Sequence, residues 1–198
     1  MCILVSSTNL YVNLPMNKYL PLTLSLIATS LTSGLANASS VNVAYEDHSL
    51  SNISLSGLSV SGSMEITDSL SIEVSTTSVD TTVSSGKTDI KYNGIGVGYN
   101  TELTDTIDLK VIVEHVSADF TTIHTTSNIS GMVYEVSFTT AIADGIDGMI
   151  GLSESNASGA TTNTIFGISV RVTDNMDLTF SSSNSQVKIK SLGLRYNF

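Results

Sequence analysis

The stretch Glu65-Ile66-Thr67-Asp68-Ser69-Leu70-Ser71-Ile72 recurs three more times along the chain in altered form. The copies read ELTDTIDL at 102–109, AIADGIDG at 141–148 and RVTDNMDL at 171–178. Each copy has an apolar residue two positions before an Asp and another two positions after it. Asp68, Asp105, Asp144 and Asp174 are spaced 37, 39 and 30 residues apart. This is the period of a two-strand unit, so the repeated segment is predicted to be its tight turn.

The segments that flank these turns alternate in polarity, as strands with two different faces do. After Asp105, apolar Leu109, Val111 and Val113 share one face, whereas Lys110 and Glu114 share the other. The four turns connect eight such segments, and residues 41–45 and 192–198 add one at each end. The sequence therefore predicts an all-β fold of ten antiparallel strands. Eight strands are the alternative, since residues 41–66 have the weakest alternation.

The polar face of these segments distinguishes two architectures. In a soluble β-sandwich the outer face carries many charged residues. Here that face is mostly Ser, Gly and Thr, and such small side chains suit the crowded interior of a closed barrel. An apolar outside, a small polar inside and tight turns at one end are typical of a transmembrane up-and-down β-barrel. A secreted β-sandwich that binds a ligand or a surface stays as the alternative.

The last strand carries a more specific signal. Leu192, Leu194, Tyr196 and Phe198 alternate, and the sequence ends on the aromatic residue. It resembles the terminal strand of bacterial outer-membrane β-barrels of the porin-like class, in which the barrel-assembly machinery reads the final aromatic side chain. The resemblance implies that Asp68, Asp105, Asp144 and Asp174 face the periplasm. It also implies that five longer loops, centred near Ser49, Ser84, Thr125, Ala157 and Ser185, face outward.

The chain contains no Trp, so an aromatic girdle at the membrane surfaces has to come from Tyr and Phe. Eight side chains are expected to supply it: Tyr45, Tyr99, Phe120, Tyr134, Phe138, Phe166, Phe180 and Tyr196.

The N-terminal region is expected to be a targeting segment. Residues 1–15 precede a more plausible start at Met16, and residues 16–38 combine a basic start, an apolar stretch and an Ala-Asn-Ala cleavage pattern. This pattern is typical of a secretory signal peptide. We expect cleavage to release residues 39–198 as one outer-membrane barrel of a Gram-negative bacterium. The single cysteine, Cys2, precedes that cleavage point, so disulfides are not expected.

Charge excludes one class of partner. The formal net charge is −10, with only eight Lys and Arg residues among 198. A nucleic-acid surface needs clustered basic residues, so nucleic acid is not an expected partner. The expected partners are outer-membrane lipid, lipopolysaccharide, the barrel-assembly machinery and small ions or solutes. Lys188 and Lys190, on the outward face of the last strand, are candidates for contacts with lipopolysaccharide phosphates.

The alternation of side chains along each strand places a set of charged residues inside the predicted barrel. One interpretation is a cation-preferring lumen, and the other is a network of ion pairs that fills a narrow barrel and acts as a structural plug. The set comprises Glu46, Glu65, Glu73, Glu102, Lys110, Glu114, Glu135, Arg171 and Arg195.

Enzymatic chemistry has little support. His115 and Ser117 resemble part of the His-x-Ser arrangement of outer-membrane lipid A deacylases, but Ala118 stands where that family has Asn, and no acid can be assigned. His48 and His124 lack metal-ligand spacing. The predicted function is therefore non-enzymatic, with no catalytic residue, no metal and no cofactor.

Overall fold

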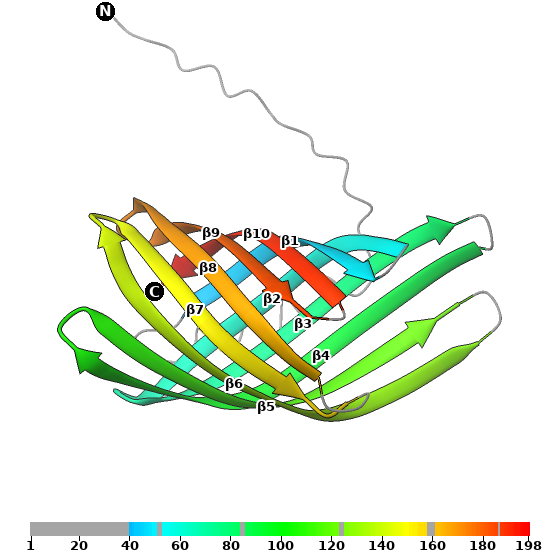
Figure 1. Cartoon of the computed structure of the whole chain (residues 1–198), viewed down its shortest axis with the longest axis horizontal. Coiled ribbons are helices and arrows are strands. Elements are labelled where there is room, and N and C mark those ends of the chain that lie inside the picture. The colour runs from blue at the N-terminus through cyan, green and yellow to red at the C-terminus, as the bar shows by residue number, and fades with distance from the viewer. Residues whose placement is uncertain (1–39, 51–52, 84–85, 123–124, 158–160, 186) are drawn as a thin grey trace, which may run out of the picture.

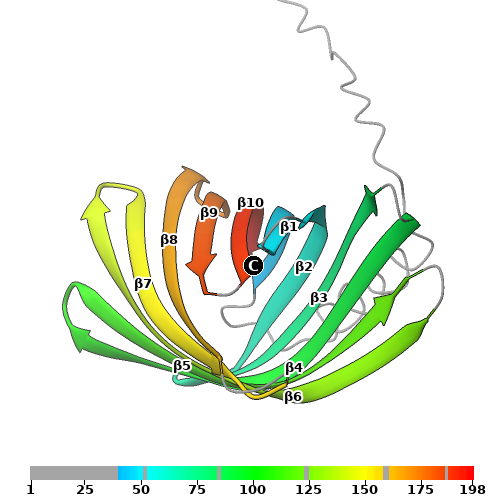
Figure 2. The same ribbon diagram turned by 45° about the vertical axis from the view of Figure 1, so that its right-hand side comes forward.

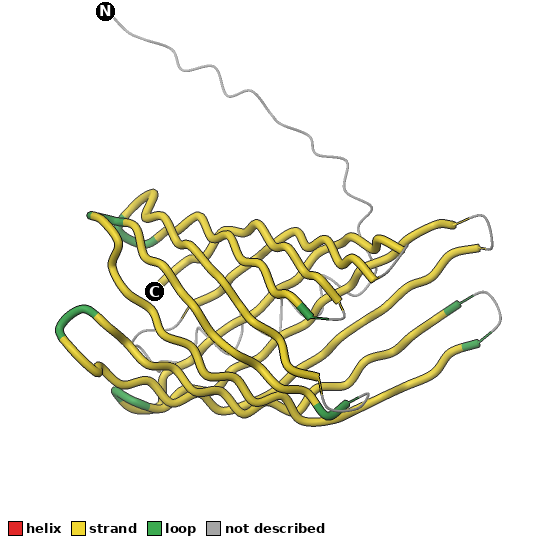
Figure 3. The backbone as a smooth tube through the Cα atoms, viewed as in Figure 1, coloured by secondary structure: helices red, strands yellow, loops and turns green. Residues whose placement is uncertain are grey.

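The computed structural model describes residues 40–50, 53–83, 86–122, 125–157, 161–185 and 187–198. The predicted leader, residues 1–38, lies outside them. No helix in this part of the chain has the length and hydropathy to cross a bilayer. Ten strands make up the fold (Figures 1 and 3): β1 (Ser40–Leu50), β2 (Ile53–Thr67), β3 (Leu70–Val83), β4 (Gly86–Thr104), β5 (Ile107–Thr121), β6 (Thr126–Ala143), β7 (Ile146–Ser155), β8 (Thr161–Thr173), β9 (Met176–Asn184) and β10 (Val187–Asn197).

Each strand pairs antiparallel with its sequence neighbour, and β1 pairs with β10 to close a barrel (Figure 2). The closing ladder runs from Ser40 opposite Asn197 to Leu50 opposite Val187. Closure gives every edge a hydrogen-bonded partner. The prediction of a ten-stranded antiparallel barrel is confirmed. The eight-strand alternative is wrong because the weakly patterned first hairpin forms a full ladder, and the sandwich is wrong because there is one closed sheet.

The repeated Asp segments share one turn geometry. Asp68, Asp105, Asp144 and Asp174 each begin a two-residue turn, and a register shift precedes every one of these turns. Between β2 and β3, Thr67 Oγ1 accepts hydrogen bonds from the backbone N–H groups of Ser69 and Leu70, at 3.3 and 3.1 Å. Between β6 and β7, Gly145 has a φ of 69° and supplies the turn conformation instead.

The apolar residue two positions before each Asp sits at the register shift, a β-bulge that re-aims a side chain. As a result, Ile66, Leu103, Ile142 and Val172 are all at least half exposed. The repeated motif therefore encodes both a tight turn and an apolar side chain displayed beside it.

The outer face of the barrel carries a belt of exposed apolar side chains. Ile150 and Leu152, both on β7, are 52% and 57% exposed, although a water-soluble fold would bury such residues. Every strand except β2 contributes, and we call these residues the outer belt: Val43, Tyr45, Leu70, Ile95, Val97, Tyr99, Ile107, Val113, Tyr134, Val136, Phe138, Ile150, Leu152, Phe166, Ile168, Leu178, Phe180, Leu192, Leu194, Tyr196 and Phe198.

The ends of β3 to β6 opposite the turns are longer than predicted. The sequence predicts longer loops centred near Ser84 and Thr125. In the structure β3 continues to Val83 and β4 begins at Gly86. Likewise, β5 continues to Thr121 and β6 begins at Thr126. We call residues 76–83, 86–93, 117–121 and 126–130 the loop-end extension (Figure 1). Its outward positions are polar, so the outer belt does not continue onto it.

The inner face of the loop-end extension is apolar. Leu55, Val79 and Ile90 form a buried cluster at 3%, 0% and 7% exposure, and Tyr92 and Phe120 pack against it. We call these five residues the apolar cap. The prediction of Phe120 as a girdle residue is wrong: its ring lies 6.5 Å from that of Tyr92, edge-on, inside the barrel. Cross-strand register places Phe120 opposite Ile90, on the inward face.

Candidate lumen site

Charged side chains line the inside of the barrel toward its turn end. The register places Glu46, Glu65, Glu73, Glu102, Lys110, Glu114, Glu135, Arg171 and Arg195 on the row that also carries the inward Ser and Gly residues. Three further carboxylates, on Asp108, Asp147 and Asp177, share this row, and strand parity could have found them in the sequence. Carboxylates therefore outnumber bases on the described inner wall.

Lys110 and Glu73 form the ion pair of one wall. Lys110 Nζ, on β5, lies 2.8 Å from Glu73 Oε1, on β3. The same oxygen accepts hydrogen bonds from Ser71 Oγ at 2.7 Å and Ser63 Oγ at 3.0 Å. A carboxylate removed from water needs such partners, and here Oε1 of Glu73 has three of them. The pair joins strands that are not adjacent, because its side chains reach across β4.

Three glycines on β4 make that reach possible. A Cβ on Gly98 would collide with Ser71 Oγ and come within 2.8 Å of Glu73 Oε1, and a Cβ on Gly94 would collide with Glu114 Oε1. Gly96 lies between them and faces the backbone of β5. The Gly-x-Gly-x-Gly run of β4 therefore makes room for inward carboxylates.

Glu114 on β5 and Glu135 on β6 add negative charge near the ion pair of Lys110 and Glu73. Glu114 Oε1 accepts a hydrogen bond from Ser75 Oγ at 2.7 Å. Glu135 interacts with Ser137 and, electrostatically, with Lys110. One ammonium group thus stands among three carboxylates, which makes this part of the lumen attractive to cations.

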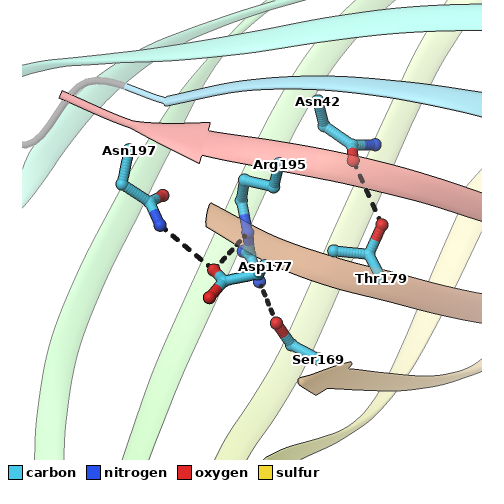
Figure 4. A network of polar contacts seen from close by, with 6 residues as sticks. All are labelled: Asn42, Ser169, Asp177, Thr179, Arg195 and Asn197. Atoms are coloured by element: carbon cyan, nitrogen blue, oxygen red, sulfur yellow. Dashed lines mark hydrogen bonds and ion pairs between the residues drawn. The ribbon is translucent and has the colours of Figure 1, made fainter. Parts of the chain in front are cut away.

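A second network crosses the opposite wall, from β10 to β8 (Figure 4). Arg195 Nη2 donates a hydrogen bond to Ser169 Oγ at 2.8 Å. Arg195 Nε lies 3.3 Å from Asp177 Oδ2, an ion pair whose N–H is not aligned for a hydrogen bond. Asn197 also donates to Asp177 Oδ2, at 3.0 Å. The guanidinium is therefore held in place on two sides.

A cavity of about 360 Å³ lies between these two walls. Its charged lining residues are Glu73 and Lys110 on one side and Asp147 and Arg195 on the other. Most of the remaining lining is small and polar. The side chains that supply it with hydrogen-bonding groups are Ser40, Asn42, Ser61, Ser63, Thr139, Ser169, Thr179, Ser181 and Ser191.

His48 marks the transition from the polar lumen to the apolar cap. It is 4% exposed, and its Nε2 lies 2.6 Å from Glu46 Oε2. Its ring stacks on Tyr92 of the cap at a centroid distance of 6.0 Å. The lumen is thus hollow and polar toward the turns, and packed and apolar along β2 to β5 toward the other end.

The structure does not assemble a catalytic site around His115 and Ser117. Both lie on the outward face of β5, and their cross-strand neighbours on β4 are Ile95 and Asn93. Among the described residues, no hydrogen bond joins His115 to Ser117 or to a carboxylate, and no group of three His, Cys, Asp or Glu residues could hold a metal ion. His124 lies outside the described residues.

Lys188 and Lys190 are exposed on the outward face of β10. They lie at the end away from the turns, where their cross-strand partners on β1 are Ser49 and Asp47. The terminal pattern of Leu192, Leu194, Tyr196 and Phe198 lies on the same face, within the outer belt, and each of these residues is 46% exposed or more. The rings of Tyr196 and Phe198 pack edge to face at 4.9 Å.

No protein-family model and no curated protein matches the chain. Among solved structures, it is similar to the beta domain of the Bordetella autotransporter BrkA, with a TM-score of 0.52 and 12% identity, covering 82% of this chain and 100% of that chain. The translocator domain of the autotransporter NalP from Neisseria meningitidis gives a TM-score of 0.48 and 8% identity, covering 90% and 94%. The attachment invasion locus protein Ail of Yersinia pestis gives 0.41 and 12%, covering 81% and 97%.

At these identities the likeness concerns the fold. The chain has the fold of the bacterial outer-membrane β-barrels, and the sequence-based prediction of this class is confirmed.

Proposed function

We propose that the protein is a small porin-like barrel of the bacterial outer membrane, with a net acidic lumen that admits small solutes and favours cations. The observation that carries the proposal is the contrast between the two faces of one closed sheet. Exposed Ile150 and Leu152 face outward, and hydroxyl groups line a cavity inside. In lipid, a closed barrel satisfies all backbone hydrogen bonds while its apolar face contacts acyl chains.

The same proposal orients the barrel. The turns at Asp68, Asp105, Asp144 and Asp174 face the periplasm, and the loop-end extension projects from the cell surface after removal of the leader. The barrel-assembly machinery reads the terminal pattern that ends at Phe198. Lys188 and Lys190, exposed above the outer belt, contact lipopolysaccharide phosphates.

Cation preference follows from the surplus of inward carboxylates. Lys110 neutralises only one of the three carboxylates on Glu73, Glu114 and Glu135. In a narrow lumen with low-dielectric walls, such a surplus raises the local concentration of cations.

The test is single-channel recording of the refolded protein in a planar lipid bilayer under a KCl gradient. We expect discrete steps and a reversal potential that favours K⁺, with reduced selectivity in a Glu114→Gln/Glu135→Gln variant. Asp119→Asn removes an acid from the outward face, where Asp119 accepts a hydrogen bond from Asn128, and serves as the matched control. A reversal potential that favours Cl⁻ would contradict the acidic lumen.

A second candidate, a structural surface barrel with a closed lumen, is favoured by the apolar cap. Val79 is fully buried and packs inside the barrel with Leu55 and Ile90. Insertion into the bilayer without conductance, in both the wild type and a cap-opening Val79→Ser variant, would favour this function over the porin-like one.

A further inference from the structure

The two ion pairs of the cavity share an asymmetry. In each pair the carboxylate is the buried member, with Glu73 and Asp177 both 14% exposed, whereas Lys110 is 32% and Arg195 is 38% exposed. Lys110 and Arg195 also line the cavity. The positive member of each pair is therefore the more accessible one, although Glu73 also lines the cavity and the lumen as a whole is acidic.

Some of the N–H donors of Arg195 are not used by its contacts with the described residues. A guanidinium group has five N–H donors in a planar fork. Its contacts in the described part of the chain engage Nε, at Asp177, and Nη2, at Ser169. Donors thus remain for a carboxylate, which is the group that this fork binds best.

Asp147 provides the opposite charge on the same wall. It lines the cavity on β7, and no described residue forms an ion pair or hydrogen bond with its carboxylate. Its direct cross-strand partner is Ser169, the residue that accepts the hydrogen bond from Arg195. Directly opposite side chains start about 4.5–5.5 Å apart, so Ser169 lies between the two charged groups: it is beside Asp147 of β7 and in contact with the guanidinium that reaches it from β10.

We infer that this cavity binds small zwitterions of the α-amino-acid class. The carboxylate of the solute binds the guanidinium of Arg195, with Lys110 facing it across the cavity, and its ammonium group binds Asp147. A purely anionic solute would leave the carboxylate of Asp147 without a counter-ion, and a purely cationic one would leave the remaining donors of Arg195 unused. A solute with both charges therefore gains two charge-assisted contacts, whereas either of the others gains one. The cavity, about 360 Å³, has room for one amino acid with its side chain, and the rows of hydroxyl groups suit polar side chains.

This inference rests on the proposed function in that the solute occupies the same lumen, but it does not require conduction. The experiment is a titration of the refolded protein in detergent micelles, followed by NMR chemical shifts, with three probes of similar size. Glycine carries both charges, glycolate only the carboxylate and ethanolamine only the ammonium group. We expect glycine to bind at least tenfold more tightly than either of the others.

The variants give the residue assignment. Asp147→Asn and Arg195→Gln are each expected to weaken glycine binding at least tenfold, while Arg195→Lys restores part of it. Asp119→Asn, which removes a carboxylate from the outward face of the loop-end extension, serves as the control and leaves binding unchanged. The backbone shifts of each variant show whether the barrel has folded, and only folded variants are compared.

Three results would overturn the inference: no glycine binding, glycolate or ethanolamine binding as tightly as glycine, or glycine binding that neither the Asp147 nor the Arg195 variant weakens. Glycine binding without channel conductance would leave the inference standing and refute the porin-like function. Conductance without glycine binding would refute the inference and leave the porin-like function standing.

Discussion

The outer-belt region and the loop-end extension use the same strands with opposite polarity. Along β4, outward Ile95, Val97 and Tyr99 lie in the belt, whereas outward Lys91 and Asn93 lie in the extension. Inward positions change in the reverse sense, from glycine in the belt region to Tyr92 and Ile90 in the extension. A strand in contact with lipid must be apolar outside, whereas a strand in water must bury its apolar side chains inside. The reversal therefore marks where β3 to β6 leave the bilayer.

The largest expected effect comes from the cap. Leu55→Ala removes a 3% exposed side chain from a packed cluster, and we expect a loss of about 2–5 kcal/mol, since the cavity left behind adds to the lost transfer free energy. Leu194→Ala, on the outer belt, loses contact with lipid that can flow into the space, so its cost should be smaller. Urea unfolding in lipid vesicles measures both, and equal losses would contradict a water-side core.

A charge placed on the belt gives the next largest effect. Val136→Arg, on an outward position of β6 that is 41% exposed, should destabilise the barrel by about 2–4 kcal/mol in vesicles. Ser117→Arg, outward on the loop-end extension, should stay within about 0.5 kcal/mol. The assay is again equilibrium unfolding in vesicles. Tolerance of Arg at both positions would place the belt in water.

Gly96 tests the crowding of the inner wall. Gly96→Ala brings a Cβ within 2.5 Å of the Val113 carbonyl oxygen and 2.8 Å of Glu114 Cα, and backbone cannot move aside easily. We expect a cost of about 1–3 kcal/mol. Gly167→Ala meets the flexible end of Met149 first, at 2.9 Å, and serves as the milder control. The free energy of unfolding in vesicles should rank Gly96→Ala below Gly167→Ala, and the reverse order would refute the crowding argument.

The smallest effect belongs to the surface of the loop-end extension. Lys87 Nζ lies 2.8 Å from Asp80 Oδ2, and this hydrogen bond raises the pKa of Lys87 above its ordinary value. Because the folded-state pKa is raised, the pair stabilises the fold fully below pH ~10 and loses its effect as the pH rises through the raised value. Both side chains are about half exposed, so Lys87→Gln should cost about 0–1 kcal/mol at pH 7.

The check on this pair is the difference in unfolding free energy between wild type and Lys87→Gln, followed as a function of pH. That difference should vanish above pH ~12, where the lysine is neutral in both the folded and unfolded states. A difference that persists there would show that Lys87 acts through packing rather than charge.

Sequence reasoning captured what alternation and turn chemistry control. The repeat around Asp68 and the parity of residues such as Leu109 and Lys110 predicted the strands, their number and their inward face. Parity alone could not predict the apolar cap, because Leu55 and Phe120 become inward core only where the strands leave the lipid. The alternation along each strand also could not predict the ion pairs. Lys110 pairs with Glu73 two strands away, and the sequence does not show which side chains reach across the glycines of β4.

The most direct test of the inverted polarity uses the absence of Trp from this chain. A single fluorophore is introduced by Phe138→Trp on the outer belt, and in a second protein by Ser117→Trp on the loop-end extension. In vesicles of lipids brominated along the acyl chains, we expect strong quenching of the first and little of the second. Equal quenching of both, or of neither, would contradict the assignment of the outer belt to the bilayer and the extension to water.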